Sequence, residues 1–432
     1  MLARLLSFRK SSTPNGTSLA AYLGSVASLS LSLVAHSIGL IILARALGVQ
    51  QFGIITLITS VSSLGLVGCG LGAGEALRRL TARNKAAYPA IFGHAVVLLL
   101  ATGGVSSLVF AVVIAAWVPI GVSFADSFIP ALLFSTSNIL LFGWVGLAEQ
   151  ALLAKDDRLR ANWVNMCTGI GRVAAVVVGC LFFGVSDART YAVWHFGFNA
   201  AASLLALALV WNHGRPVLGI VRQEIPRGFS ISMTAAFVVV RQNVDVLLVG
   251  MIAPASVVGV YGIARRLTAT AQVSTAALDR LIISDLARAG RFGLAPTYQL
   301  AKHYAGYCIA LALSASLALH LAAPLIVWVF GPQYQSAIGM TQILAWTLVF
   351  TSLQWTASDA LNAAEYHRYR LIGEVCTGAV AMLALGGLGF LAGVNGILAA
   401  SYAGGIGGVI IMWSILHVLA RRSEDLQVVN QP

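Results

Sequence analysis

The chain has 432 residues, of which 58% are hydrophobic and only 10% are charged. A soluble globular domain carries roughly 25% charged residues, because its water-facing shell must be polar. This composition excludes a soluble fold and indicates an integral membrane protein, so the net charge of +12 is informative mainly through its placement along the chain.

A helix needs about 20 apolar residues to cross a hydrocarbon core of about 30 Å. Twelve segments reach this length, and the eighth is the weakest because it contains Arg265 and Arg266. In chain order the predicted spans cover about 19–43, 52–74, 90–116, 128–150, 162–184, 190–211, 229–252, 256–282, 304–330, 337–362, 372–392 and 396–419. We therefore predict an all-α integral membrane protein of about twelve transmembrane helices.

The connecting loops indicate the orientation, because Lys and Arg accumulate on the cytoplasmic side of short loops. With the N-terminus inside, 21 basic residues fall in inner loops and termini, and only Arg45 and Arg189 fall in outer loops. An extra or missing span in mid-chain would destroy this asymmetry. We predict a multi-pass protein of the plasma membrane with both termini in the cytoplasm.

Two segments suggest an internal repeat. The sequence ALGVQQFG from Ala46 and the sequence APASVVG from Ala253 each lead through a glycine, Gly53 or Gly259, into a helix rich in small residues. Farther on, AEQALLAKDDR from Ala148 resembles ASDALNAAEYHR from Ala357. Six spans per half imply parallel repeats about an axis along the membrane normal, a known transporter plan.

This repeat predicts two six-helix lobes around a central cavity. The predicted division is an N-terminal lobe at 1–211, a basic cytoplasmic linker at 212–228 and a C-terminal lobe at 229–432.

Four arginines lie deep in predicted spans, where a charge is costly unless it faces protein or water. They are Arg172, Arg241, Arg265 and Arg266. One hypothesis is a cationic cavity that binds an anionic group, since a guanidinium donates two parallel hydrogen bonds to a phosphate. The alternative is internal ion pairing, and it stands equally for Arg241, because Asp245 follows it by four residues on the same helix face. Arg265 and Arg266 are adjacent, so we expect only one of them to face the cavity directly.

Other ionisable residues give weaker signals. We expect most carboxylates near inner helix ends to be solvated or paired with loop arginines. These carboxylates are Glu75, Glu149, Asp279, Asp359 and Glu374. His36 in the first span, like Asp245, is a candidate coupling or gating residue.

Signatures of catalysis and of metal binding are missing from the sequence. The histidines lack metal-ligand spacing, and the five cysteines form no CxxC pair. No GxxxxGK[ST], HExxH or GxSxG motif occurs. We predict no enzymatic activity, no cofactor and no nucleic-acid partner.

Four segments carry a resemblance to a known family: ARALGVQQFG at 44–53, NVDVLLVG with Asp245, VVGVYGIARRL from Val257 and PLIVWVFGPQYQSAIGMTQILAW from Pro324. These segments resemble the polysaccharide flippases, which belong with the multidrug and toxin extrusion transporters and the peptidoglycan lipid flippases. The resemblance implies a central cavity lined by the first, second, seventh and eighth helices. Arg241, Asp245, Arg265 and Arg266 are then well placed for substrate binding, and Arg45 would guard the outer mouth, whereas Arg172 on the fifth helix fits this plan less well.

The resemblance also implies a cargo, an oligosaccharide on a polyprenyl diphosphate turned from the inner to the outer leaflet by alternating access. Such a flippase serves the assembly of surface polysaccharide or exopolysaccharide, with membrane lipids and the pathway's polymerase and export proteins as partners. The alternatives are a cation-coupled drug exporter, a membrane glycosyltransferase or polymerase, and a membrane scaffold that does not transport.

Overall fold

The computed structural model describes the backbone of residues 19–211 and 214–429, and side chains within 37–211 and 214–423 except those of residues 277, 280 and 281. Every regular element in this described part of the chain is helical, and it contains no strand. The protein is therefore an all-α membrane protein, as the composition predicted.

The N-terminal half is built from long helices with local breaks. The helices are α2 (Leu19–Gly68), α3 (Ala73–Arg83), α4 (Tyr88–Trp117), α5 (Phe124–Ser135), α6 (Phe142–Ala154), α7 (Arg158–Val176) and α8 (Ala188–Trp211). A π-helical segment, Thr136–Leu141, joins α5 to α6, so the two form a single pass, and a second one, Val177–Phe182, extends α7.

The C-terminal half repeats this plan. Its helices are α9 (Ile225–Ile252), α10 (Ala255–Gly290), α11 (Leu294–Ala322), α12 (Leu325–Phe330), α13 (Ala337–Ala345), α14 (Thr347–Ala363) and α15 (His367–Val429). Both α2 and α15 contain a glycine with positive φ, Gly48 at 73° and Gly393 at 59°. Glycine adopts this region without steric cost, so each long helix is two passes separated at that residue.

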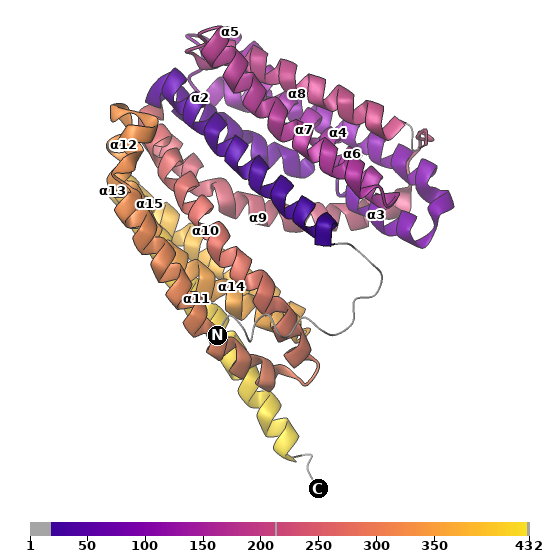
Figure 1. The fold of residues 1–432 in the computed structure, drawn as a ribbon, viewed down its shortest axis with the longest axis vertical. Coiled ribbons are helices and arrows are strands. Elements are labelled where there is room, and N and C mark those ends of the chain that lie inside the picture. Colours follow the sequence, from indigo (N-terminus) through magenta and orange to yellow (C-terminus); the bar gives the residue numbers. More distant parts are fainter. Residues whose placement is uncertain (1–18, 212–213, 430–432) are drawn as a thin grey trace.

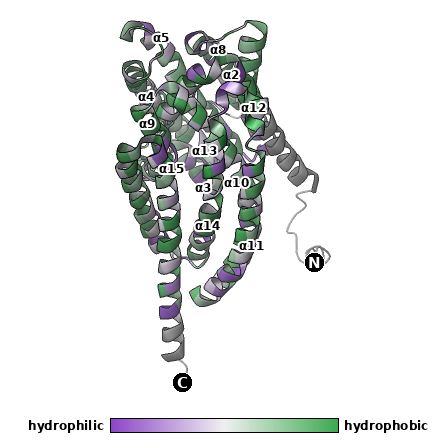
Figure 2. Cartoon of the chain, turned by 90° about the vertical axis from the view of Figure 1, so that its left-hand side faces the viewer, coloured by the Kyte–Doolittle hydropathy of each residue, from purple (hydrophilic) through white to green (hydrophobic). Residues whose placement is uncertain are grey.

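Nine helices within the described residues are long and apolar enough to cross a membrane. The helices α2 and α15 each carry two predicted spans, and α10, which is not among the nine, carries the eighth span with its two arginines. The helices thus account for all twelve predicted spans. Figure 2 shows hydrophobic residues along most of the described helices. On α4, Leu100, Val105 and Leu108 are each more than half exposed, as a lipid-facing surface requires.

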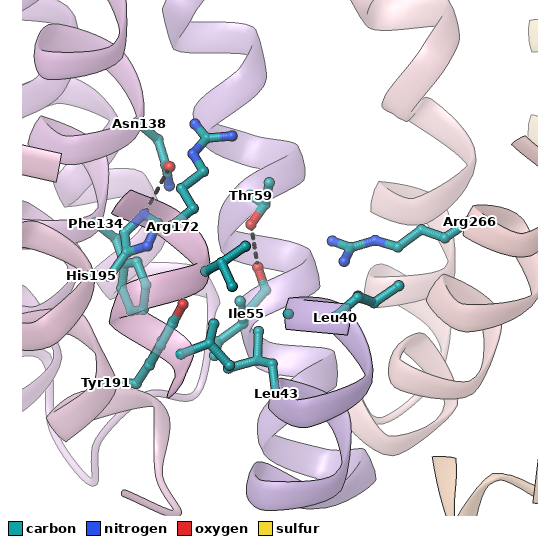
Figure 3. A pocket seen from close by; sticks show the side chains of 13 residues that line it. Leu40, Leu43, Ile55, Thr59, Phe134, Asn138, Arg172, Tyr191, His195 and Arg266 are labelled. Carbon is teal, nitrogen blue, oxygen red and sulfur yellow. Dashed lines mark hydrogen bonds between the residues drawn. The ribbon is translucent and has the colours of Figure 1, made fainter. Parts of the chain in front are cut away.

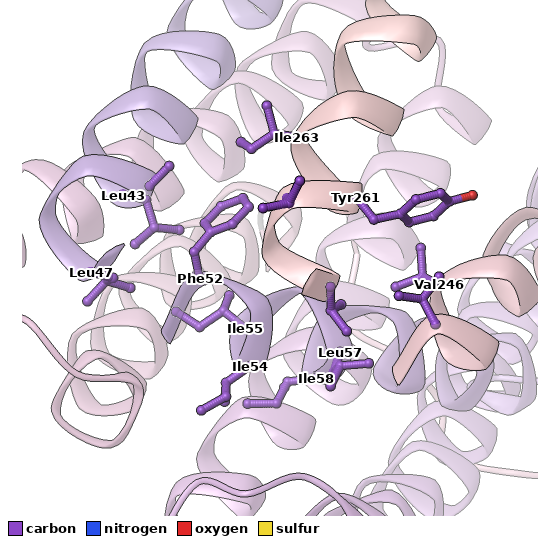
Figure 4. Packing of buried hydrophobic residues seen from close by; sticks show 14 of the residues in the cluster. Leu43, Leu47, Phe52, Ile54, Ile55, Leu57, Ile58, Val246, Tyr261 and Ile263 are labelled. Carbon is purple, nitrogen blue, oxygen red and sulfur yellow. The ribbon is translucent and has the colours of Figure 1, made fainter. Parts of the chain in front are cut away.

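The helices form two lobes that converge at one end and diverge toward the other (Figure 1). The convergent end carries α5, α12 and the turn of α2 at Gly48, and our predicted orientation assigns it to the outside. Here α2 packs against α10, and a buried apolar cluster that includes Phe52, Ile58 and Ile263 fills the junction (Figure 4).

The two lobes touch through backbone at the convergent end. A Cβ on Gly53 would lie 1.7 Å from the carbonyl oxygen of Ala255, and a Cβ on Gly259 would lie 2.2 Å from that of Val49. The contact is reciprocal, because Ala255 and Gly259 follow Val49 and Gly53 at the same spacing of 206 residues. Such reciprocity is expected where an axis relating two repeats passes between them.

Further contacts seal this junction. The hydroxyl of Tyr334 donates to the carbonyl of Ala44 at 3.1 Å, and its ring meets Phe52 edge-on with 6.2 Å between centroids. The described contacts therefore close the cavity at the end assigned to the outside.

The linker between the halves is fastened to the N-terminal lobe. The amide of Val217 donates to the carbonyl of Pro89 at 2.9 Å, and the carboxylate of Glu224 accepts from Arg79 at 2.5 Å. Consequently α9 begins against the N-terminal lobe and runs to α15 in the other lobe. The division at 212–228 stays a prediction.

We predict that Gly53→Ala opens the convergent end, because the new methyl group cannot fit against the Ala255 carbonyl. In a cysteine-free background, Thr59→Cys in the cavity should become reactive to a membrane-impermeant thiol reagent added on the side opposite the termini. Gly104→Ala is the matched control, since nothing lies within 4 Å of a Cβ there. Unchanged protection of the reporter in Gly53→Ala would contradict the proposed seal.

Candidate substrate cavity

A cavity of about 690 Å³ lies between the two lobes. Its wall comes from α2 on one side and from α9, α10, α14 and α15 on the other. This volume lies within the range of about 300–1,000 Å³ that is usual for small-molecule sites. We call it the central cavity.

Hydroxyl groups cover the α2 side of the central cavity. Thr56, Thr59, Ser60 and Ser63 all line it. Their spacing of i, i+3, i+4 and i+7 places them on one face of a helix. We did not predict this stripe from the sequence, although its helical period is visible there.

A smaller cavity of about 160 Å³ adjoins the central cavity and shares Thr59 and Arg266 with it. Arg172 of α7 and His195 of α8 also line it. Figure 3 shows Arg172 and Arg266 reaching toward α2 from opposite sides. The structure therefore brings Arg172, which fitted the predicted cavity less well, next to the same cavity system as Arg266.

Neither Arg172 nor Arg266 has a carboxylate within ion-pair distance among the described side chains. The Arg172 guanidinium lies over the Phe142 ring at 4.5 Å, and its Nε is buried without a hydrogen-bond partner. The Arg266 guanidinium lies over the Phe52 ring at 5.4 Å. Cation–π contacts offset only part of the cost of a desolvated charge, so both residues remain available to an anion.

Polar groups also line the smaller cavity on the N-terminal side. His195 Nε2 contacts the Asn138 side-chain oxygen at 3.1 Å, and His195 Nδ1 lies 3.5 Å from the Asn199 amide nitrogen, which also donates to the His195 carbonyl at 2.7 Å. The two contacts to the ring nitrogens orient the imidazole beside the smaller cavity.

Arg265 is an ion-pair residue, unlike its neighbour Arg266. Its Nε lies 2.6 Å from Asp245 Oδ2, and its Nη2 donates to the carbonyl of Gln242. The Tyr261 hydroxyl also donates to Asp245, at 2.8 Å. The interpretation that Asp245 pairs with Arg241 is wrong, because the carboxylate turns from α9 toward α10.

Arg241 pairs instead with Glu374 of α15, with 3.7 Å between Nη1 and Oε2. Both residues line another cavity, of about 710 Å³, within the C-terminal lobe. We call it the C-lobe cavity. Because Arg241 and Trp355 also line the central cavity, the two cavities adjoin.

The carboxylates near inner helix ends are only partly as predicted. Glu75 pairs with Arg78 at 3.1 Å on the exposed surface. Asp279 is only 8% exposed, however, and its Oδ2 has no hydrogen-bond partner. The expectation of solvation is wrong for Asp279, because the residue points into the lobe beside the C-lobe cavity, which Asp359 also lines.

Two further candidates remain, Arg45 and His36. Arg45 is exposed and donates to the Trp328 carbonyl across the convergent end, so it contacts the junction of the lobes instead of lining a cavity. His36 lies outside the residues whose side chains are described. Within the described residues, no group of three or more His, Cys, Asp or Glu side chains could hold a metal ion.

Comparison with known proteins identifies the fold. No family model and no curated sequence matches the chain. An inward-facing multidrug resistance MATE family transporter of the MOP superfamily matches with a TM-score of 0.73 and 14% identity, over 94% of this chain and 99% of that one. The lipid II flippase MurJ in an inward closed conformation matches with a TM-score of 0.70 and 13% identity, over 90% of this chain and 86% of that one.

An outward-facing MATE structure gives a lower TM-score of 0.60 at 16% identity, over 93% of each chain. At these identities the similarity establishes the fold alone, which this chain shares with these solved structures.

We predict that Asp245→Asn lowers the apparent melting temperature in detergent, because it leaves Arg265 half-buried without its counter-charge. Breaking a buried pair in this way costs about 3 kcal/mol. Glu75→Gln, which breaks an exposed pair, should have little effect. Adding Arg265→Gln to Asp245→Asn should restore part of the loss. Restoration by Arg241→Gln instead would contradict the pairing of Asp245 with Arg265.

Proposed function

We propose that this protein flips a polyprenyl-diphosphate-linked oligosaccharide from the inner to the outer leaflet of the plasma membrane. The observation that carries the proposal is the pair Arg172 and Arg266, two cations that have no carboxylate partner among the described side chains and that line adjoining cavities. Two guanidinium groups suit a diphosphate, because each offers paired donors to phosphate oxygens. The similarity to a lipid II flippase also supports a lipid-linked cargo.

The proposed mechanism is alternating access. With the convergent end sealed through Gly53 and Gly259, the diphosphate binds at the arginines from the inner side. The glycan occupies the polar central cavity while the lipid tail stays in the bilayer. The lobes then rock about their junction, and the cavity opens outward. An inside-negative potential aids outward movement of an anion by roughly 2.3 kcal/mol per unit charge per 100 mV.

Cation-coupled drug export is the second candidate function, and a specific observation favours it. Asp279 is buried with an unpartnered carboxylate oxygen, and such a group suits a cation or a cationic drug. The similarity to multidrug transporters supports the same candidate. The central cavity itself favours an anion, however, because Asp245 is already paired with Arg265.

The proposal extends to cellular context. It implies both termini in the cytoplasm, no enzymatic step in this chain, and a place beside the polymerase and export proteins of a surface polysaccharide pathway. Arg45, at the lobe junction, would act in closure instead of substrate binding.

We predict that cells lacking this protein accumulate lipid-linked oligosaccharide on the inner leaflet, and that wild type clears it. Arg172→Ala and Arg266→Ala should each fail to clear it while inserting normally, because each removes half of the diphosphate site. Arg189→Ala is the matched control, since Arg189 is exposed and pairs with Asp126 at 3.7 Å away from the cavities.

An unchanged level of lipid-linked oligosaccharide, together with raised sensitivity to cationic drugs, would reject the flippase and support the exporter. Clearance by both arginine variants at the wild-type rate would instead reject the assigned anion site.

A further inference from the structure

We infer that the wall of the central cavity formed by α14 and α15 is a binding subsite for an uncharged glycan. This inference rests on the proposed function and deepens it, because it names the class of sugar that the flippase would accept. It distinguishes a neutral oligosaccharide from one that carries uronic acids or other acidic groups.

Two side chains in this wall have polar atoms without partners. Gln354 of α14 is 5% exposed and Thr377 of α15 is 3% exposed, and both residues line the central cavity. Within the described part of the chain, the Gln354 amide nitrogen and the Thr377 hydroxyl oxygen have no hydrogen-bond partner. A buried polar group without a partner is destabilising, so such groups call for a ligand, a water molecule or another function.

A glycine holds these two side chains beside each other. A Cβ on Gly408 would lie 2.7 Å from the Gln354 side-chain oxygen and 2.8 Å from Thr377 Cγ2. Any other residue at 408 would displace one or both of them. The second pass of α15 thus approaches closely enough to fix an amide and a hydroxyl at one place in the wall.

Trp355 follows Gln354 and lines both the central cavity and the C-lobe cavity. Its indole offers a flat apolar surface on which the C–H face of a sugar ring can pack, while hydroxyl and amide groups bind the ring's edge. The two cavities, of about 690 and 710 Å³, meet at this residue. Together they provide room for more than one sugar ring.

The charges in this region disfavour acidic sugars. Arg265 and Arg241, which could bind a carboxylate, are already paired with Asp245 and Glu374, and in the proposed function the diphosphate occupies Arg266. The adjoining C-lobe cavity adds the carboxylates of Asp279 and Asp359, against Arg370, whose Nε donates to Ser358. A uronic acid would meet these carboxylates, whereas a neutral sugar can bind the amide, hydroxyl and indole groups of Gln354, Thr377 and Trp355.

The inference is tested by binding to the purified full-length protein, measured by calorimetry with three probes. They are farnesyl diphosphate, farnesyl-diphosphate-linked glucose and farnesyl-diphosphate-linked glucuronate. The glucose-linked probe should bind with an affinity about tenfold higher than that of farnesyl diphosphate alone. This gain is expected from one or two new hydrogen bonds and from packing of the sugar ring. Glucuronate should bind no better than farnesyl diphosphate.

Thr377→Val and Gln354→Leu should each remove much of the gain from glucose and leave the binding of farnesyl diphosphate unchanged. Thr341→Val is the matched control, because the Thr341 hydroxyl is also buried and unpartnered but does not line the central cavity. Arg266→Ala should weaken all three probes equally.

The outcomes separate the two proposals. Suppose that wild type binds farnesyl diphosphate, but that linked glucose does not raise the affinity or that linked glucuronate raises it equally. The glycan subsite is then rejected, while the proposed flippase function is retained. If wild type binds none of the probes, or Arg266→Ala binds them all as wild type does, the diphosphate site of the proposed function is rejected.

Discussion

The close backbone contact between α2 and α10 is the interaction on which the architecture depends. The internal repeat relates two glycines, Gly53 and Gly259. Beside each of them a backbone carbonyl of the other helix occupies the space that a side chain would need. Membrane helices lack a hydrophobic drive to associate, so such contact between small residues is what holds lobes together. Because the contact lies at one end, the lobes diverge toward the other end and leave the central cavity between them (Figure 1). The junction at the convergent end also suits a rocking motion of rigid lobes, and α9 links the lobes elsewhere, where it begins against the N-terminal lobe.

The distribution of ionic partners gives this cavity its chemical character. In a membrane interior a charge must be paired or must face water or a ligand. Arg265 and Arg241 satisfy this rule because they form ion pairs with Asp245 and Glu374. These ion pairs connect α9 to α10 and to α15. Arg172 and Arg266 lie instead over aromatic rings at the cavity surface. The four arginines thus divide into two with carboxylate partners and two without one among the described side chains, and the second two are those that we propose bind an anionic cargo.

Much of this fold follows from the sequence, because hydropathy and the asymmetry of basic loops are local signals. They predicted twelve spans, including the weak one that became α10. The spacing of Gly53 and Gly259 also anticipated the repeat. Partnerships across helices were not predictable, since helical spacing shows that Arg241 and Asp245 share a face but not which helix that face meets. In the structure, α9 is oriented so that Asp245 forms an ion pair with Arg265 of α10 and Arg241 forms one with Glu374 of α15. The burial of Asp279 was missed for the same reason, whereas the hydroxyl stripe of α2 has a period that could have been found.

The most direct test of the anion site is a transport assay in proteoliposomes that contain the purified protein. Such vesicles would carry either a fluorescent polyprenyl-diphosphate oligosaccharide with neutral sugars or a cationic dye, and movement across the bilayer would be followed for each. We expect rapid flipping of the lipid-linked oligosaccharide, its loss in Arg172→Ala and Arg266→Ala, and no transport of the dye. Transport of the dye without flipping of the lipid would contradict the anion site and would assign the cavity to cation export.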